Sequence, residues 1–164
     1  MKEIEFKIKG LMMDPLTNSP IVVLQDTTSE TLLPIWVGIF EANAIALQIE
    51  KVDTPRPMTH DLIKGLLNHL NAQVMKVVVT ELKDNTFYAL IFINVNDKIL
   101  TVDSRPSDAI ALALRTNSPI YVTDDVIAKS SALNATAGSD RSSPEQIRQW
   151  LENLSPDDLG KYKM

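Results

Sequence analysis

The chain has 164 residues, of which 45% are hydrophobic, and a formal net charge of −5 at pH 7. This length can bury one core and carry a small appendage. The negative charge argues against a domain that binds nucleic acid tightly through a broad basic face, because that affinity comes mostly from Lys and Arg replacing counterions on phosphates. Cysteine is absent, so any metal would be held by carboxylates and imidazoles, which favours Mg²⁺ or Mn²⁺.

The cellular location is predicted from two features of the sequence. No run of 18 apolar residues occurs, so no membrane-spanning helix is expected. The N-terminus alternates charged and apolar residues and lacks the apolar stretch of a signal peptide. We therefore expect a cytoplasmic protein with no membrane partner.

The first part of the chain is predicted to form three strands and a helix. Residues 3–13 alternate as a strand does, and strands over residues 21–25 and 32–37 follow after polar turns. Trp36, in an apolar strand, is expected in the core. A helix is expected over residues 39–51, with Glu41 in its first turn.

The second part begins at Pro55-Arg56-Pro57, which predicts an extended linker. Thr59 is expected to cap a helix that reaches residue 70 and has a wide apolar stripe: Leu62, Ile63, Leu66, Leu67 and Leu70. Further elements are expected as strands over residues 74–82, 86–94, 98–102 and 119–122, a helix over 106–116 and a helical turn over 124–129. Strand alternation places one of Phe87 and Tyr88 toward the core.

The order of elements predicts the fold class. Both halves read as β-β-β-α, and Ala44-Ile45-Ala46-Leu47 matches Ala109-Ile110-Ala111-Leu112. We predict an α/β (α+β) fold with a mixed, largely antiparallel sheet, packed helices and an internal β-β-β-α duplication. This duplication would place Glu41 and the segment 103–108 at equivalent strand-to-helix corners.

A change of composition near residue 134 predicts the domain organisation. Residues 1–133 form the main domain, residues 134–142 a flexible linker, and residues 143–164 a helical appendage. The appendage has one apolar face: Ile147, Trp150, Leu151 and Leu154. This face must dock on the main domain, on a second subunit or on another protein.

Two polar motifs at helix starts are the candidates for chemistry. The first is Arg56-Pro57-Met58-Thr59-His60-Asp61, and the second is Asp103-Ser104-Arg105-Pro106-Ser107-Asp108. Acids next to an arginine can hold a metal-activated water beside a clamped phosphate. The same residues also suit ordinary helix caps and Asp–Arg ion pairs, with His60 as an exposed bystander. The sequence alone leaves both interpretations open.

A family resemblance rests on several spaced motifs in one order. They are Leu33-Pro34-Ile35-Trp36-Val37-Gly38, Glu41-Ala42-Asn43-Ala44-Ile45-Ala46-Leu47, Pro55-Arg56-Pro57-Met58-Thr59-His60-Asp61-Leu62, Asn85-Thr86-Phe87-Tyr88-Ala89 and Asp103-Ser104-Arg105-Pro106-Ser107-Asp108-Ala109-Ile110-Ala111-Leu112. Over residues 1–126 the chain resembles the bifunctional nuclease family. This resemblance implies a mixed α/β domain, commonly oligomeric, with DNase and RNase activity.

Carried over by position, the charged residues of these motifs are Glu41, Arg56, His60, Asp61, Asp103, Arg105 and Asp108. We predict metal-assisted hydrolysis of DNA or RNA phosphodiesters. In this hypothesis Glu41, Asp61, Asp103 and Asp108 hold Mg²⁺ or Mn²⁺, His60 activates water, and Arg56 and Arg105 clamp the phosphate. The alternative is a non-catalytic oligomeric module whose C-terminal helix docks a partner. A homo-oligomer is expected in either case.

Overall fold

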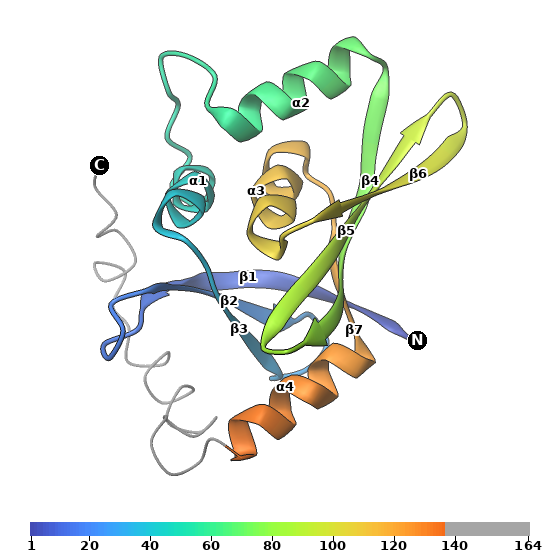
Figure 1. The fold of residues 1–164 in the computed structure, drawn as a ribbon. Coiled ribbons are helices and arrows are strands. Elements are labelled where there is room, and N and C mark those ends of the chain that lie inside the picture. Colours follow the sequence, from blue (N-terminus) through green and yellow to red (C-terminus); the bar gives the residue numbers. More distant parts are fainter. Residues whose placement is uncertain (137–164) are drawn as a thin grey trace.

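The computed structural model describes residues 1–136, which form a twisted sheet with helices packed on it (Figure 1). The strands are β1 (Glu3–Met13), β2 (Pro20–Asp26), β3 (Leu32–Trp36), β4 (Ala72–Lys83), β5 (Thr86–Val95), β6 (Lys98–Ser104) and β7 (Ile120–Thr123). The helices are α1 (Ile39–Ile49), α2 (Thr59–His69), α3 (Pro106–Thr116) and α4 (Asp124–Thr136). No helix in this range is long and apolar enough to cross a membrane.

The sheet has seven strands in the order β3-β2-β1-β7-β4-β5-β6. Every neighbouring pair is antiparallel except β4 and β7. The short strand β7 therefore joins two antiparallel meanders, β1 to β3 and β4 to β6. Each meander leads into a helix, α1 or α3, so the predicted mixed sheet and the β-β-β-α order of both halves are confirmed.

Two tight hairpins set the register of the second meander. Asp84 and Asn85 separate β4 from β5, and Asn96 and Asp97 separate β5 from β6. All four residues have positive φ, between 50° and 64°. Two-residue turns with this geometry match the twist of the strands, and Asn and Asp tolerate it better than other non-glycine residues.

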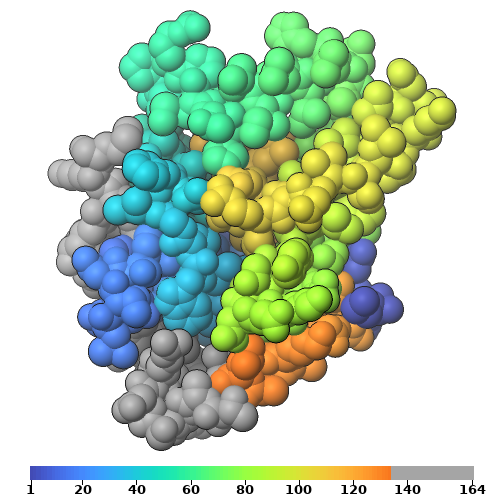
Figure 2. Space-filling model, in the orientation of Figure 1, coloured from blue at the N-terminus to red at the C-terminus, as the bar shows by residue number. Residues whose placement is uncertain are grey.

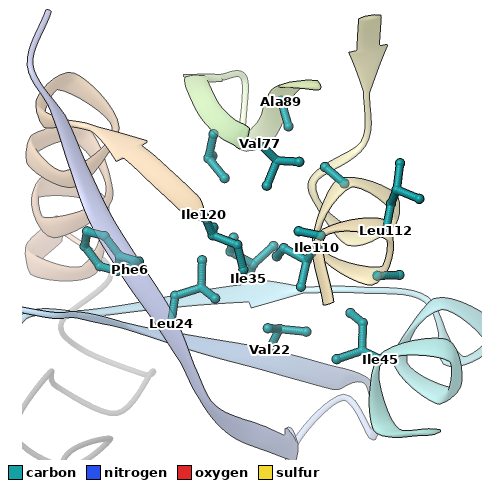
Figure 3. Close-up of a cluster of buried hydrophobic side chains, with 14 of the residues drawn as sticks. Phe6, Val22, Leu24, Ile35, Ile45, Val77, Ala89, Ile110, Leu112 and Ile120 are labelled. Carbon is teal, nitrogen blue, oxygen red and sulfur yellow. The ribbon is translucent and has the colours of Figure 1, made fainter. Parts of the chain in front are cut away.

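The core lies between the sheet and helices α1 and α3 (Figure 3). Val22, Ile45, Val77 and Ile110 are each at most 1% exposed. Helix α3 packs against α1 and α2 as well as against β4 and β5. It is therefore buried over most of its surface and forms the centre of the domain.

Edge position overturns the prediction that Trp36 is a core residue. Its strand β3 is one edge of the sheet, and Trp36 is 44% exposed. The indole Nε1 donates a hydrogen bond to Asp14 Oδ2 at 3.1 Å. Phe87 packs against the core while Tyr88 is 41% exposed, as strand alternation predicts.

Helices α2 and α4 differ from expectation. The N-cap of α2 is Met58 and not Thr59, because Asp61 Oδ2 already accepts the Met58 N–H at 3.0 Å. Helix α4 continues to Thr136, beyond the expected end at residue 129. The remainder of the predicted linker and the whole predicted appendage, residues 137–164, lie outside the described residues.

Truncation of Ile110 should measure how much the domain depends on α3. Ile110→Ala removes a side chain that is 0% exposed, so we expect the free energy of unfolding to fall by about 2–5 kcal/mol. Phe40→Ala is the control, because Phe40 is 85% exposed and its removal should change stability by less than about 0.5 kcal/mol. Urea denaturation of both variants measures the difference, and equal losses would contradict this account of the core.

Candidate functional site

Each of the helices α1, α2 and α3 carries an acid at its third residue. These acids are Glu41, Asp61 and Asp108. A carboxylate in the first turn complements the positive end of the helix dipole. All three side chains also bond to an arginine, and the pairs Glu41–Arg105 and Asp61–Arg115 connect α1 and α2 to α3.

Arg105 bridges the two strand-to-helix corners that the predicted duplication makes equivalent. Its Nη2 donates to Glu41 Oε1 at 2.8 Å, and its Nε donates to Asp108 Oδ2 at 2.8 Å. The hydrogen bond to Asp108, followed by the one to Glu41, raises the pKa of the guanidinium. The Arg105 side chain is nevertheless 65% exposed, and its Nη1 has no hydrogen bond within residues 1–136. One face of a firmly held cation therefore meets solvent.

His60 is held by the same aspartate. Its Nε2 lies 2.9 Å from Asp108 Oδ1, and the residue is only 7% exposed, so it is not an exposed bystander. When Nε2–H of His60 donates to the Asp108 carboxylate, Nδ1 is the acceptor nitrogen of the imidazole. Within residues 1–136 Nδ1 has no partner, yet no buried side-chain nitrogen there lacks one. Solvent can therefore reach Nδ1.

Asp61 faces a different arginine from the one that holds Glu41 and Asp108. Its Oδ1 accepts a hydrogen bond from Arg115 Nε at 2.7 Å, and its Oδ2 accepts the Met58 N–H. Burial alone would raise the pKa of Asp61, but the hydrogen bonds from Met58 and Arg115 outweigh burial and lower it below 3.8. Asp61 therefore belongs to a structural ion pair that adjoins the site.

Arg115 is the residue that sequence reasoning missed. Its side chain is 2% exposed, and it also donates to Ala111 O at 2.8 Å and to Ala44 O at 3.0 Å. These contacts join α1, α2 and α3 at one buried guanidinium. The available signal was a single basic residue at the end of the otherwise apolar run Ala109-Ile110-Ala111-Leu112-Ala113-Leu114.

Gly38 is a second residue that the sequence did not single out. It is the N-cap of α1, with φ −71° and ψ 157°, so any residue could adopt its backbone conformation. A Cβ at this position would overlap Glu41 Oε2. The absence of a side chain therefore leaves room for the Glu41 carboxylate that bonds Arg105.

Two predicted site residues lie apart from this group. Arg56 and Asp103 are both exposed, and neither side chain bonds to Glu41, His60, Arg105 or Asp108 in the described part of the chain. Within residues 1–136 no three His, Asp or Glu side chains are grouped closely enough to hold one metal ion. The predicted ligand set of Glu41, Asp61, Asp103 and Asp108 stays a prediction.

The lowered pKa of Asp61 predicts a pH dependence of stability. Because this pKa is lower in the folded chain than its usual value of 3.8, the Asp61 charge stabilises the fold above that pH. The stabilisation is lost as the pH falls through the lowered value. Asp61→Asn should therefore lower the melting temperature at neutral pH, and the difference from the natural chain should shrink below pH 3.8.

Asp125→Asn is the matched control for this measurement. Asp125 pairs with Lys129 at the surface, where both side chains are more than a third exposed. Such pairs contribute about 0–1 kcal/mol, so this change should hardly move the melting temperature at any pH. Equal effects of the two substitutions across the pH series would contradict the special role of Asp61.

Comparison with known proteins gives the family. A family model described as the bifunctional nuclease domain matches residues 22–134. An uncharacterized protein of Mycobacterium tuberculosis is 38% identical over 163 residues, covering 94% of this chain and 97% of that protein. Bifunctional nuclease 2 of Oryza sativa subsp. japonica is 33% identical over 107 residues, covering 63% of this chain and 33% of that protein.

A second rice protein matches a similar region. Bifunctional nuclease 1 of Oryza sativa subsp. japonica is 26% identical over 114 residues, which are 68% of this chain and 34% of that protein. The matched segments are thus about a third of each rice protein. The family model covers well over half of the chain and includes both corners joined by Arg105, so the chain belongs to the bifunctional nuclease domain family.

Proposed function

We propose that this domain is a nuclease that hydrolyses phosphodiester bonds of DNA or RNA at the corner formed by Arg105, Asp108 and His60. Family membership supports this proposal. The observation that carries it is that Asp108 holds both partners, with Oδ2 on Arg105 and Oδ1 on His60. An exposed cation and an imidazole are thereby fixed next to each other, which is the minimum needed to bind a phosphate and deprotonate a water molecule.

In the proposed mechanism the free Nη1 of Arg105 donates to a non-bridging phosphate oxygen. The first turns of α1, α2 and α3 meet around Asp108, and their N-terminal N–H groups favour an anion there. Nδ1 of His60 takes the proton of the attacking water, and Asp108 stabilises the imidazolium that results. As the water oxygen bonds to phosphorus, the P–O bond to the departing sugar oxygen breaks. The departing oxygen takes a proton from solvent, and the imidazolium returns its proton to solvent. Glu41 acts on the phosphate only through Arg105 and is a positioning residue.

The divalent cation expected from the sequence is kept as a separate prediction. Glu41 and Asp108 are both bonded to Arg105, whose charge competes with a cation for their oxygens. The residues of the described range thus do not fit a metal centre as they stand, and we assign no step to a metal ion. Assays with Mg²⁺, with Mn²⁺ and with a chelator will determine whether the activity depends on one.

The two histidines of the chain provide a matched test of the proposed base. His60→Gln should lower the cleavage rate of single- or double-stranded DNA or RNA by about 10²–10⁴-fold, because a general base is lost. His69→Gln should leave the rate unchanged, since His69 is exposed and its Nδ1 hydrogen-bonds to the Gly65 carbonyl oxygen at 2.8 Å, away from Asp108. Rates are measured on purified full-length protein with fluorescent oligonucleotides.

Three outcomes of this assay would be informative. If His60→Gln and His69→Gln lose the same activity, the substitutions act through the folding of α2. If His60→Gln cleaves as fast as the natural chain, His60 is not the base. Absence of cleavage by the natural chain on every substrate, with and without metal, would instead support the non-catalytic oligomeric module. The observation in favour of that alternative is that Glu41, Asp61 and Asp108 are all satisfied by arginines as ordinary helix-end acids.

Gly38→Ala should test the positioning role of Glu41 without touching the backbone. The added Cβ displaces the Glu41 carboxylate, so Arg105 loses one of the two carboxylates that hold it. Cleavage should fall by about 10-fold or more. Complete removal of a hydrogen-bond donor that stabilises the transition state typically lowers the rate by about 10²–10³-fold. Gly65→Ala is the control, because a Cβ there meets no atom within 4 Å. It should retain full activity and raise the free energy of unfolding by about 0.5–1 kcal/mol. Unchanged cleavage by Gly38→Ala would remove Glu41 from the proposal.

A further inference from the structure

The two edge strands of the sheet differ in how well they are protected. Strand β3 has five residues, and Pro34 at its centre has no N–H to offer a new neighbour. Strand β6 at the other edge has seven residues and neither a proline nor a bulge. Unprotected edges of this kind pair readily with further strands. Among the described strands, β6 is therefore the open edge.

The hydrophobic core continues onto β6 and is uncovered there. Val74, Ile93 and Leu100 lie directly opposite one another on β4, β5 and β6, so their side chains share one face of the sheet. Their exposure rises from 6% and 9% to 52% at the edge. The exposure of the neighbouring row, Val77, Ile91 and Val102, increases in the same way, from 1% and 8% to 46%.

Helix α2 adds a second uncovered apolar stripe near this edge. Ile63 and Leu67 pack against the core, as the predicted stripe required. The other members of that stripe, Leu62, Leu66 and Leu70, are 56%, 56% and 69% exposed. Figure 2 shows α2 in green directly above β6 in yellow on the same side of the molecule. We call the exposed edge of β6, with the apolar side chains of Leu100 and Val102, the β6 surface.

We propose that the β6 surface is the interface of a homodimer in which β6 pairs antiparallel with β6 of a second copy. A two-fold axis through Thr101 would place each Leu100 opposite the partner's Val102. Leu100 and Val102 of each copy would then contact the same residues of the other copy, so that both apolar rows continue across the junction. The sheets would join into one continuous sheet, and the unpaired backbone groups of both edges would be satisfied.

Charge complementarity favours a second copy over an unrelated strand. In the register centred on Thr101, the turn residue Asp97 of one copy lies level with Arg105 of the other. Both residues are exposed. The pairing brings Asp97 of one copy near Arg105 of the other at both ends of the interface. Within residues 98–104 it places no like charges opposite each other. It also places an acid of the partner beside the corner that holds Arg105, a consequence that does not depend on nuclease activity.

Sedimentation velocity of the full chain at tens of micromolar tests the association. The natural chain should sediment as a species of twice 18.3 kDa. The double variant Leu100→Lys, Val102→Lys should sediment at 18.3 kDa with an unchanged circular dichroism spectrum, because both side chains are about half exposed in the monomer. The control Leu16→Lys, Ile49→Lys adds the same charge at exposed apolar residues elsewhere and should remain dimeric.

Single cysteines test the register, because the natural chain contains none. Thr101→Cys should form a covalent dimer on mild oxidation, since paired antiparallel Cα atoms lie about 4.5–5.5 Å apart and disulfides span about 4.4–6.8 Å. Ile99→Cys is the control on the same strand face. In this register the two Ile99 residues of the dimer lie four residues apart along the strand, about 14 Å at about 3.4 Å per residue, so the variant should not crosslink. The proposal would be overturned if the natural chain sediments at 18.3 kDa, or if Ile99→Cys crosslinks and Thr101→Cys does not.

Discussion

Burial of the Arg115 guanidinium determines how the helices around the candidate site are arranged. A buried charge is tolerated only when it is paired and fully hydrogen-bonded. The partners of Arg115 come from α1, α2 and α3, so satisfying this one side chain brings the three helices together. Asp108 and Arg115 are seven residues apart, which is about two helical turns and places them on one face of α3. They contact His60 and Asp61, two consecutive residues of α2. The contact that neutralises Arg115 therefore also places the imidazole beside Asp108.

The duplicated β-β-β-α order explains why the two corners meet. In each half a meander ends and a helix starts with an acid at its third residue, Glu41 in α1 and Asp108 in α3. The helices pack against each other, and Arg105 occupies the junction between the two acids. Helix α2 lies between α1 and the second meander. The site is therefore a symmetric junction of two corners to which α2 adds His60.

Local chemistry made most of the elements predictable, whereas long-range pairing did not. The start of α3 at residue 106 and the break between the strands over residues 74–82 and 86–94 were predicted correctly. Pro106 and the turn residues Asp84 and Asn85 each determine the backbone geometry at their own positions. Trp36 was predicted wrongly because the sequence does not reveal which strand lies at an edge. The sequence identified the seven charged motif residues but not how they group. In the fold, Glu41, His60, Arg105 and Asp108 are bonded together, Asp61 pairs with Arg115, and Arg56 and Asp103 lie apart. This grouping depends on contacts between positions 48 to 64 residues apart, which the sequence does not reveal. Arg115 was missed for the same reason, since only a folded chain reveals that Asp61 faces it.

The balance of charge at the corner explains how an acidic domain could still receive a phosphate. Glu41, Arg105 and Asp108 together carry one excess negative charge when ionised. Three helix N-termini surround them, each equivalent to about half a positive charge. The charges of these side chains and the helix dipoles nearly cancel, so electrostatic attraction alone cannot hold a nucleic acid at the corner. This agrees with the net charge of −5 of the chain. Recognition at such a corner must depend on directed hydrogen bonds from Arg105 and helix N–H groups, which act only at short range. Binding would then be weak and geometrically selective, and the substrate would leave readily after reaction.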